Sequence, residues 1–273
     1  MTDRILLSID AGVAEVRLNR PDKMNAIDPA MFDALVAIGE RLMNEPDLRA
    51  VVLSGEGRAF CAGLDMGSMA SLGSNDASSG GGRLARRTHG AANVPQYACT
   101  VWSDLPVPVL AAVHGVAYGG GLQIALGADV RYVSADTRLS IMEIKWGLVP
   151  DMGGMALTRG LVRPDQLREL IYSGRIVNGE EARALGLATH VVEDPRAAAL
   201  AAARDIAQKS PDAIRAAKRL MRVVEDGDTA AILLAESIEQ DRLIGGANQR
   251  EAVRAGMEKR APVFQPAAKA AGE

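Results

Sequence analysis

The sequence predicts an α/β fold followed by a nearly all-helical C-terminal part. Two glycine-rich turns each follow a short run of apolar, β-branched residues, and helical spacing of apolar residues separates the strand-like runs. This alternation is typical of parallel βαβ units. The alanine-rich sequence beyond residue 195 has only helical periodicity. We therefore expect an α/β core over residues 1–195 and a helical region over residues 196–273.

The first half of the core begins with predicted strands at residues 5–9 and 14–18. Asp28 and Pro29 predict a helix start, because aspartate caps helix N-termini and proline is favoured in the first turn. Buried strands are predicted at residues 50–53 and 107–113, each leading to one glycine-rich turn. The segment 67–101 between them is predicted to be a loop, since much of it is rich in glycine and serine.

The second half of the core begins with a helix that ends near Leu126. Strands are predicted at residues 130–133 and 139–142, the latter leading directly to Glu143, and a turn rich in glycine and proline follows. Further helices are predicted at residues 165–172, 179–185, 195–208, 211–224, 230–244 and 247–259.

The composition favours a protein that acts on small molecules. The 273 residues are 48% hydrophobic and 24% charged, with a formal net charge of -3, so the overall charge does not favour nucleic-acid binding. No apolar stretch reaches the length that a membrane-spanning helix needs. The 2 cysteines are too few for a disulfide framework, and we expect a cytoplasmic protein.

The glycine-rich turns indicate the chemistry. Each can direct backbone N–H groups at one point, and such donors stabilise the oxygen of a thioester when it becomes an enolate. Acyl-thioester chemistry is therefore the leading hypothesis. The sequence contains no P-loop, no HExxH zinc motif and no GxSxG nucleophile elbow. No metal cluster is evident.

Three acidic residues lie near turns: Asp65, Glu143 and Asp151. Glu143 is the best candidate base, because its position between Met142 and Ile144 predicts burial, which raises the pKa of a carboxyl group. Glu143 could instead cap a helix or pair with an arginine. Asp151 follows Pro150 and is equally compatible with a role in forming its turn.

Four segments together resemble the crotonase, or enoyl-CoA hydratase/isomerase, superfamily, and they occur in the same order and spacing. They are Leu18-Asn19-Arg20-Pro21-Asp22-Lys23-Met24-Asn25-Ala26, Gly57-Arg58-Ala59-Phe60-Cys61-Ala62-Gly63-Leu64-Asp65, residues 111–121 and residues 141–154. The resemblance implies a crotonase-like spiral of ββα units with a C-terminal helical trimerisation region. It also implies a homotrimer or a dimer of trimers.

The resemblance also implies which residues bind an acyl-CoA substrate. The amides of Leu64 and Gly120 would form the oxyanion hole. Contacts to the coenzyme A part would come from Lys23, Met24, Ala26 and Ala62, with Asp65 beside them, and Lys259 would reach phosphate bound at an adjacent subunit. Asp65 could instead hold its own turn in place. Coenzyme A is part of the substrate, so no cofactor is expected.

Hydratases of the superfamily use two glutamates, at the positions of Glu143 and Gln123. An amide cannot exchange a proton near neutral pH. The replacement of the second glutamate by Gln123 therefore implies weak hydration activity. Asp151 matches an aspartate of the dienoyl-CoA isomerases, and with Glu143 it could move a double bond without water. Other superfamily reactions (a hydrolase, dehalogenase or decarboxylase), a catalytically silent acyl-CoA binder and a serine peptidase of the related Clp-type fold are the alternatives.

Overall fold

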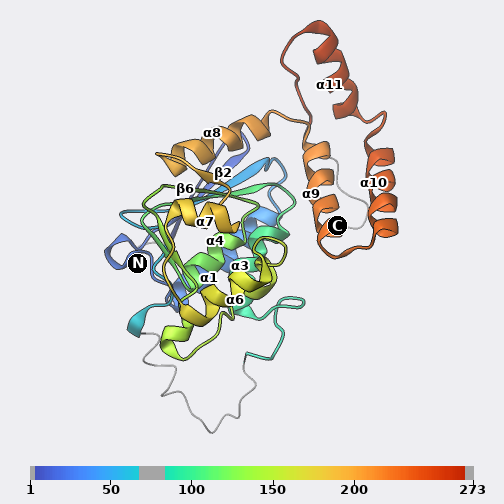
Figure 1. Cartoon of the computed structure of the whole chain (residues 1–273). Helices are drawn as coiled ribbons and strands as arrows, with labels where there is room; N and C mark the ends of the chain where they lie inside the picture. The colour runs from blue at the N-terminus through green and yellow to red at the C-terminus, as the bar shows by residue number, and fades with distance from the viewer. Residues whose placement is uncertain (1–3, 68–83, 268–273) are drawn as a thin grey trace.

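The computed structural model describes residues 4–67 and 84–267 of the chain. Its main sheet has six strands in the order β1-β2-β3-β4-β6-β8 (Figure 1). β1 is antiparallel to β2, and all later neighbours are parallel, which confirms the predicted βαβ arrangement. The strands are β1 (Ile5–Asp10), β2 (Val13–Leu18), β3 (Ala50–Gly55), β4 (Val109–Val113), β6 (Val130–Val133) and β8 (His190–Val191).

Both faces of this sheet are buried, as its apolar central strands require. Val51 and Val109 belong to the larger core, which α1 (Pro29–Met43), α3 (Val94–Asp104) and α4 (Gly120–Leu126) complete on one face. Val52 and Leu110, at alternate positions of the same strands, belong to a second core under α8 (Pro195–Ala207). The helices on the two faces hold the strand ends, and hence the turns that follow them, in fixed positions.

The structure corrects the prediction of a loop over residues 67–101, because α3 lies partly inside that range. The side chain of Asn93 accepts a hydrogen bond from the Gln96 amide, and the side chain of Gln96 accepts one from the Asn93 amide. This reciprocal capping box, followed by Pro95 in the first turn of α3, is a helix-start signal that the sequence carried. The rest of the predicted loop, residues 68–83, lies outside the described residues.

A small second sheet brings the second glycine-rich turn to Glu143. It pairs β5 (Val116–Tyr118) in parallel with β7 (Arg138–Ser140), which ends two residues before the predicted end at Met142. β5 leads to Gly119, whose N–H donates to the Ser140 carbonyl at 2.9 Å. After β7 the chain enters the 3₁₀ helix η2 (Glu143–Trp146), of which Glu143 is the first residue. The end of β5 and the start of η2 therefore lie side by side.

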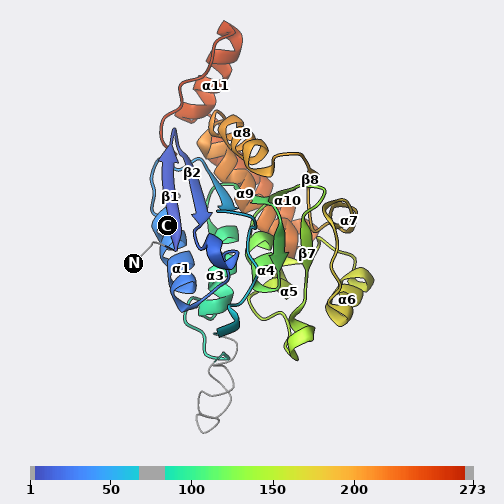
Figure 2. The same cartoon turned by 90° about the vertical axis from the view of Figure 1, so that its left-hand side faces the viewer.

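Of the remaining helices, α5 (Gly154–Leu157) was not predicted and follows the predicted turn. The others follow largely as predicted: α6 (Pro164–Ser173), α7 (Gly179–Leu185), α9 (Pro211–Asp226), α10 (Thr229–Leu243) and α11 (Ala247–Glu258). α9 contacts the core where the Lys218 ammonium donates to the Val107 carbonyl at 2.8 Å, and α10 packs against α9. α11 stands away from the sheet in both views (Figures 1 and 2).

Candidate active site

The first glycine-rich turn, Cys61–Asp65, is held by backbone hydrogen bonds to residues 24–27. Ile27 donates to the Gly63 carbonyl at 2.8 Å and accepts from the Asp65 amide at 2.9 Å. This pattern is a parallel bridge between Ile27 and Leu64. In such a bridge the intervening residue directs its own N–H away from the partner segment. The Leu64 amide therefore points to the side opposite Ile27.

The second turn packs directly against the first. A Cβ atom on Gly63 would lie 2.6 Å from the Tyr118 carbonyl oxygen and 3.7 Å from the Gly120 nitrogen, and one on Gly121 would lie 2.4 Å from the Cys61 carbonyl oxygen. Gly119 has a φ of 50°, a left-handed conformation that glycine tolerates best. Only glycines allow so close an approach. Leu64 and Gly120 thus lie on adjoining turns, as a shared oxyanion site requires, and their role as donors stays a prediction.

Glu143 lies beside this pair of turns. A Cβ atom on Gly119 would be 3.4 Å from Glu143 Oε1, and the Glu143 residue is 9% exposed. Gln123 Nε2 donates to Oε1 at 2.6 Å. Within the described part of the chain, Oε2 is buried and has no hydrogen-bond partner. One carboxylate oxygen is therefore held in place and the other is left available to a proton.

Burial is the main cause that raises the pKa of Glu143 above its ordinary value. Hydrogen bonds from its own backbone amide and from Gln123 oppose the rise, and the negative charge of Asp151 adds to it. Burial likewise raises the pKa of Asp151, although that residue is partly open to solvent. Glu143 is thus the more buried of the two carboxyl groups, and the pKa of each is raised mainly by burial.

Gln123, on α4, is fixed by three hydrogen bonds. Its Nε2 donates to Glu143, and its Oε1 accepts from the Met152 amide at 2.9 Å and from the Gly154 amide at 2.8 Å. Because an amide nitrogen only donates and an amide oxygen only accepts, these partners fix which way the group faces. Gln123 therefore links the Glu143 carboxylate to the loop that carries Asp151.

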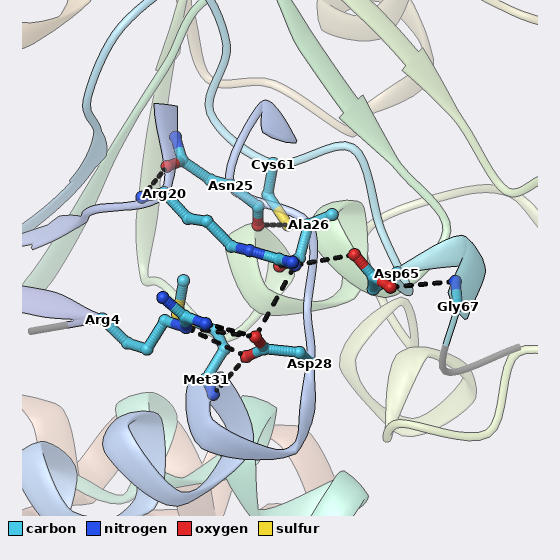
Figure 3. Close-up of polar contacts among 9 residues, drawn as sticks. All are labelled: Arg4, Arg20, Asn25, Ala26, Asp28, Met31, Cys61, Asp65 and Gly67. Atoms are coloured by element: carbon cyan, nitrogen blue, oxygen red, sulfur yellow. Dashed lines mark hydrogen bonds and ion pairs between the residues drawn. The ribbon is translucent and has the colours of Figure 1, made fainter. Parts of the chain in front are cut away.

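Asp65 lies at the end of the first turn and is anchored by its side chain. Its Oδ1 accepts from the Gly67 amide at 2.9 Å, and its Oδ2 lies 2.8 Å from Nη1 of Arg20 (Figure 3). The same Nη1 donates to the Ala26 carbonyl at 3.0 Å. These contacts agree with the expectation that Asp65 stabilises its own turn. The predicted contact between Asp65 and coenzyme A stays a prediction.

The predicted coenzyme A segment is a short folded stretch around η1 (Pro21–Lys23). Lys23 ends this 3₁₀ helix, and Met24, with a φ of 50°, caps it in the left-handed region. The Ala62 amide donates to the Met24 carbonyl at 2.9 Å, so four of the predicted binding residues (Lys23, Met24, Ala26 and Ala62) lie along one edge of the first turn. Lys259 is the C-cap residue of α11, a helix that stands away from the sheet (Figures 1 and 2).

Two residues that shape the site were absent from the predicted set. Asn25 is fully buried, and its Nδ2 donates to the carbonyls of Glu56, Ala59 and Phe60 at 3.0, 2.8 and 3.1 Å. Arg20 joins Asp65 to Ala26 as described above. Both belong to the first segment that carries the family resemblance, but the Nδ2 partners of Asn25 lie 31 to 35 residues away and Asp65 lies 45 residues from Arg20. No local pattern reports such contacts.

Among the described residues, no helix is both long and apolar enough to cross a membrane. In the same residues, no three histidine, cysteine, aspartate or glutamate side chains are grouped so that they could hold a metal ion. Both cysteines are buried free thiols; Cys61 donates to the Asn25 carbonyl at 3.1 Å, and burial raises its pKa to about 12. The thiol of Cys61 thus packs within the first turn.

Comparison with known proteins agrees with the resemblance. A model of the family described as enoyl-CoA hydratase/isomerase matches residues 8–267. The mouse mitochondrial Delta(3,5)-Delta(2,4)-dienoyl-CoA isomerase is 35% identical over 210 residues, which are 76% of this chain and 64% of that protein. The enoyl-CoA hydratase EchA19 of Mycobacterium tuberculosis is 33% identical over 258 residues, or 92% of each chain.

The fold has close counterparts among solved structures. The crystal structure of an enoyl-CoA hydratase from Bacillus anthracis superimposes with a TM-score of 0.86 at 27% identity, covering 96% of this chain and 98% of that one. A crystal structure of an enoyl-CoA hydratase from Mycobacterium smegmatis gives a TM-score of 0.83 at 29% identity, covering 95% and 98%. The predicted crotonase-like fold is thereby confirmed. The chain belongs to the enoyl-CoA hydratase/isomerase family.

Proposed function

We propose that this protein moves a carbon–carbon double bond in an enoyl-CoA thioester through an enolate intermediate, with Glu143 as the base. The observation that carries the proposal is the state of the Glu143 carboxylate. Its Oε1 is held by Gln123, while its Oε2 is buried without a partner in the described residues, next to the turn that begins α4. A buried, oriented carboxylate with a raised pKa suits proton transfer near neutral pH.

The proton balance needs neither water nor a cofactor. Glu143 takes a proton from a carbon of the acyl chain, the electron pair of that C–H bond forms a new double bond, and the original double bond shifts toward the carbonyl carbon. The thioester oxygen carries the charge and accepts hydrogen bonds from the amides of Leu64 and Gly120. Asp151, protonated at the start, delivers a proton to a second carbon and restores the thioester, and the proton on Glu143 then passes to Asp151.

Gln123 favours this reaction over hydration. Addition of water requires a second group that can exchange a proton, and the amide of Gln123 is committed by all three of its hydrogen bonds to holding Glu143 and the loop 152–154. Asp151 supplies a second carboxyl whose charge acts on Glu143. The chain is about equally similar to a dienoyl-CoA isomerase and to an enoyl-CoA hydratase, so Gln123 and not overall identity favours isomerisation.

The test is the exchange of substrate protons with deuterated water. The wild-type protein should exchange protons at C2 or C4 of an enoyl-CoA, and Glu143→Gln should reduce exchange by about 100- to 10,000-fold, the usual value of a positioned base. Nuclear magnetic resonance of the recovered thioester measures both. Exchange that is unchanged in the variant would reject Glu143 as the base, and absence of exchange in wild type would reject the proposed reaction.

We further propose that the region 196–273 mediates assembly into a homotrimer or a dimer of trimers, and that the protein is cytoplasmic. Support for assembly comes from exposed apolar residues on the last two helices, among them Leu233, Leu234 and Met257, the last 82% exposed. Large apolar side chains that are exposed in one chain favour burial against another chain. Lys259 would then reach the coenzyme A phosphates of a neighbouring subunit. Light scattering of wild type and of Leu234→Asp tests the assembly.

A further inference from the structure

A small ion-pair cluster connects the first glycine-rich turn to the start of α1 (Figure 3). Arg20 Nη1 lies 2.8 Å from Asp65 Oδ2, 3.0 Å from the Ala26 carbonyl oxygen and 3.7 Å from Asp28 Oδ2. The side chains of Arg20 and Asp65 are only 15% and 19% exposed. Their contact is thus partly shielded from water, where ion pairs are screened less than at the surface.

The cluster divides its charges between two pairs. Arg4 binds Asp28 through three contacts of 3.2, 3.1 and 2.6 Å, and Asp28 also caps α1 by accepting from the Met31 amide at 2.9 Å. Because Arg4 already neutralises Asp28, the charge of Arg20 is available to Asp65. The cluster of two arginines and two aspartates has no net formal charge.

The position of Asp65 gives this pair a consequence for the site. Leu64 is flanked by Gly63 and Asp65, whose backbones are both bonded to Ile27. The Arg20 side chain hydrogen-bonds to Asp65 at the end of the turn and to the carbonyl of Ala26, one residue before Ile27. The direction of the Leu64 N–H therefore depends on the backbone hydrogen bonds to Ile27 and on the contact of Arg20 with Asp65.

The positive charge of Arg20 also favours stabilisation of an enolate at this site. Asp65 follows directly after the amide that would receive the negative oxygen of an enolate, and an uncompensated carboxylate there would oppose the developing charge. We propose that Arg20 is a positioning residue that orients the Leu64 amide through Asp65 and neutralises that carboxylate. This inference rests on the proposed enolate chemistry at Leu64 and Gly120.

The experiment compares Arg20→Gln with Arg17→Gln, which breaks a partly buried ion pair with Glu56 and leaves the cluster around Arg20 unchanged. Two readouts are the kinetics of double-bond migration and the absorption maximum of bound 4-dimethylaminocinnamoyl-CoA. This push–pull thioester absorbs at longer wavelength when its carbonyl oxygen accepts strong hydrogen bonds. Arg20→Gln should lower kcat by about 10- to 100-fold with little change in KM, and should reduce the wavelength shift.

The control and rescue variants separate positioning from stability. Arg17→Gln should lower the melting temperature by a similar amount while keeping kcat and the wavelength shift within about twofold of wild type. Arg20→Lys should retain part of kcat, because one ammonium replaces the charge but not the planar geometry. Adding Asp65→Asn to Arg20→Gln should recover part of the loss, since it removes the unpaired carboxylate.

Each outcome decides between the proposals. If wild type shifts the chromophore and Arg20→Gln keeps both kcat and the shift at the level of Arg17→Gln, Arg20 is only a structural residue and the inference is overturned. If wild type itself produces no shift, the oxyanion site is wrong and both proposals fall together. Should Arg20→Gln fail to fold, Arg20→Lys makes the same comparison, and an unaltered kcat and shift in that variant would also overturn the inference.

Discussion

Glu143 and Asp28 are both largely buried carboxylates, but their surroundings differ. Glu143 has a neutral amide as its partner on one oxygen and, in the described residues, no partner on the other. Asp28 has the Arg4 guanidinium, the Met31 amide and a nearby Arg20. For each group burial alone would raise the pKa; at Glu143 it prevails, whereas at Asp28 the hydrogen bonds outweigh it and the pKa is lowered.

The difference shows how one fold assigns opposite roles to the same functional group. A carboxylate without a cationic partner readily takes up a proton, which suits a base. A carboxylate surrounded by donors stays ionised and serves as an anchor for a helix start and a turn. Four changes would break or sharpen this contrast.

The largest effect is expected at Asp151, the carboxyl that interacts with Glu143. Asp151→Asn should slow double-bond migration by about 100-fold or more, because the second carbon loses its proton donor, while exchange at the first carbon continues. Both are measured on one sample by nuclear magnetic resonance. Asp226→Asn, at an exposed ion pair with Arg159, is the matched control. Equal losses of exchange and migration would assign Asp151 to the first step instead.

A smaller change in activity is expected from Gln123→Glu. A carboxyl at this position would lie within hydrogen-bond distance of Glu143, so the two groups would titrate as a coupled pair and one would carry a proton near neutral pH. Hydration of crotonyl-CoA should then increase by at least about 10-fold. Product analysis with wild type as the reference measures it, and a flat hydration rate would show that the amide does not limit that reaction.

Removing the anchoring carboxylate should cost stability. Asp28→Ala deletes the cap of α1 and the partner of Arg4, so the free energy of unfolding in urea should fall by about 1–2 kcal/mol at pH 7. Because the pKa of Asp28 is lowered by folding, its contribution is present above the unfolded pKa of about 4 and is lost as the pH falls through the folded value. The difference from wild type should therefore shrink in acid.

Asp165→Ala is the control for this loss, because that aspartate lies in the first turn of α6 and forms an exposed pair with Arg163. Its effect should be the smaller of the two. Equal destabilisation by both variants would contradict the importance of the buried cluster around Asp28.

The smallest effect, of opposite sign, is expected for the stability of Glu143→Gln. The pKa of Glu143 is raised by folding, so its contribution is present below the unfolded pKa of about 4.3 and is lost as the pH rises through the folded value. The variant should be more stable than wild type by about 1 kcal/mol at pH 8, and the gain should vanish toward pH 4. Thermal unfolding across this range measures it, and a loss of stability at pH 8 would contradict an unpaired ionised group.

Local patterns were sufficient for most elements of the fold. Continuous apolar runs in β3 and β4 predict strands buried on both faces, and Asp28-Pro29 predicts the start of α1. The capping box at Asn93 and Gln96 was an equally local signal for α3, but the glycine- and serine-rich sequence before it favoured a loop. The ends of strands were predicted less accurately than their positions. The pairing of β7 with β5 ends at Ser140, although apolar residues continue to Met142.

The parts of the candidate site that lie within short continuous segments of the sequence were predictable. Glu143 between two apolar residues predicts a buried carboxyl, and the glycines at 119–121 predict a turn that another backbone can approach. Gln123 was expected only as a replacement for a second acid. Its actual contacts join three segments of the chain, from α4, η2 and the loop 152–154, so no sequence window contains them.

The sequence by itself determined the order of strands and helices, the two glycine-rich turns and the residue types available to them, because these follow from the local spacing of apolar, glycine and capping residues. Only the tertiary structure decided that Arg20 meets Asp65, that Gln123 holds one oxygen of Glu143, and that the other oxygen stays buried without a partner in the described chain. The physical reason is that pairing, burial and pKa depend on neighbours brought together by packing, across separations such as the 45 residues between Arg20 and Asp65.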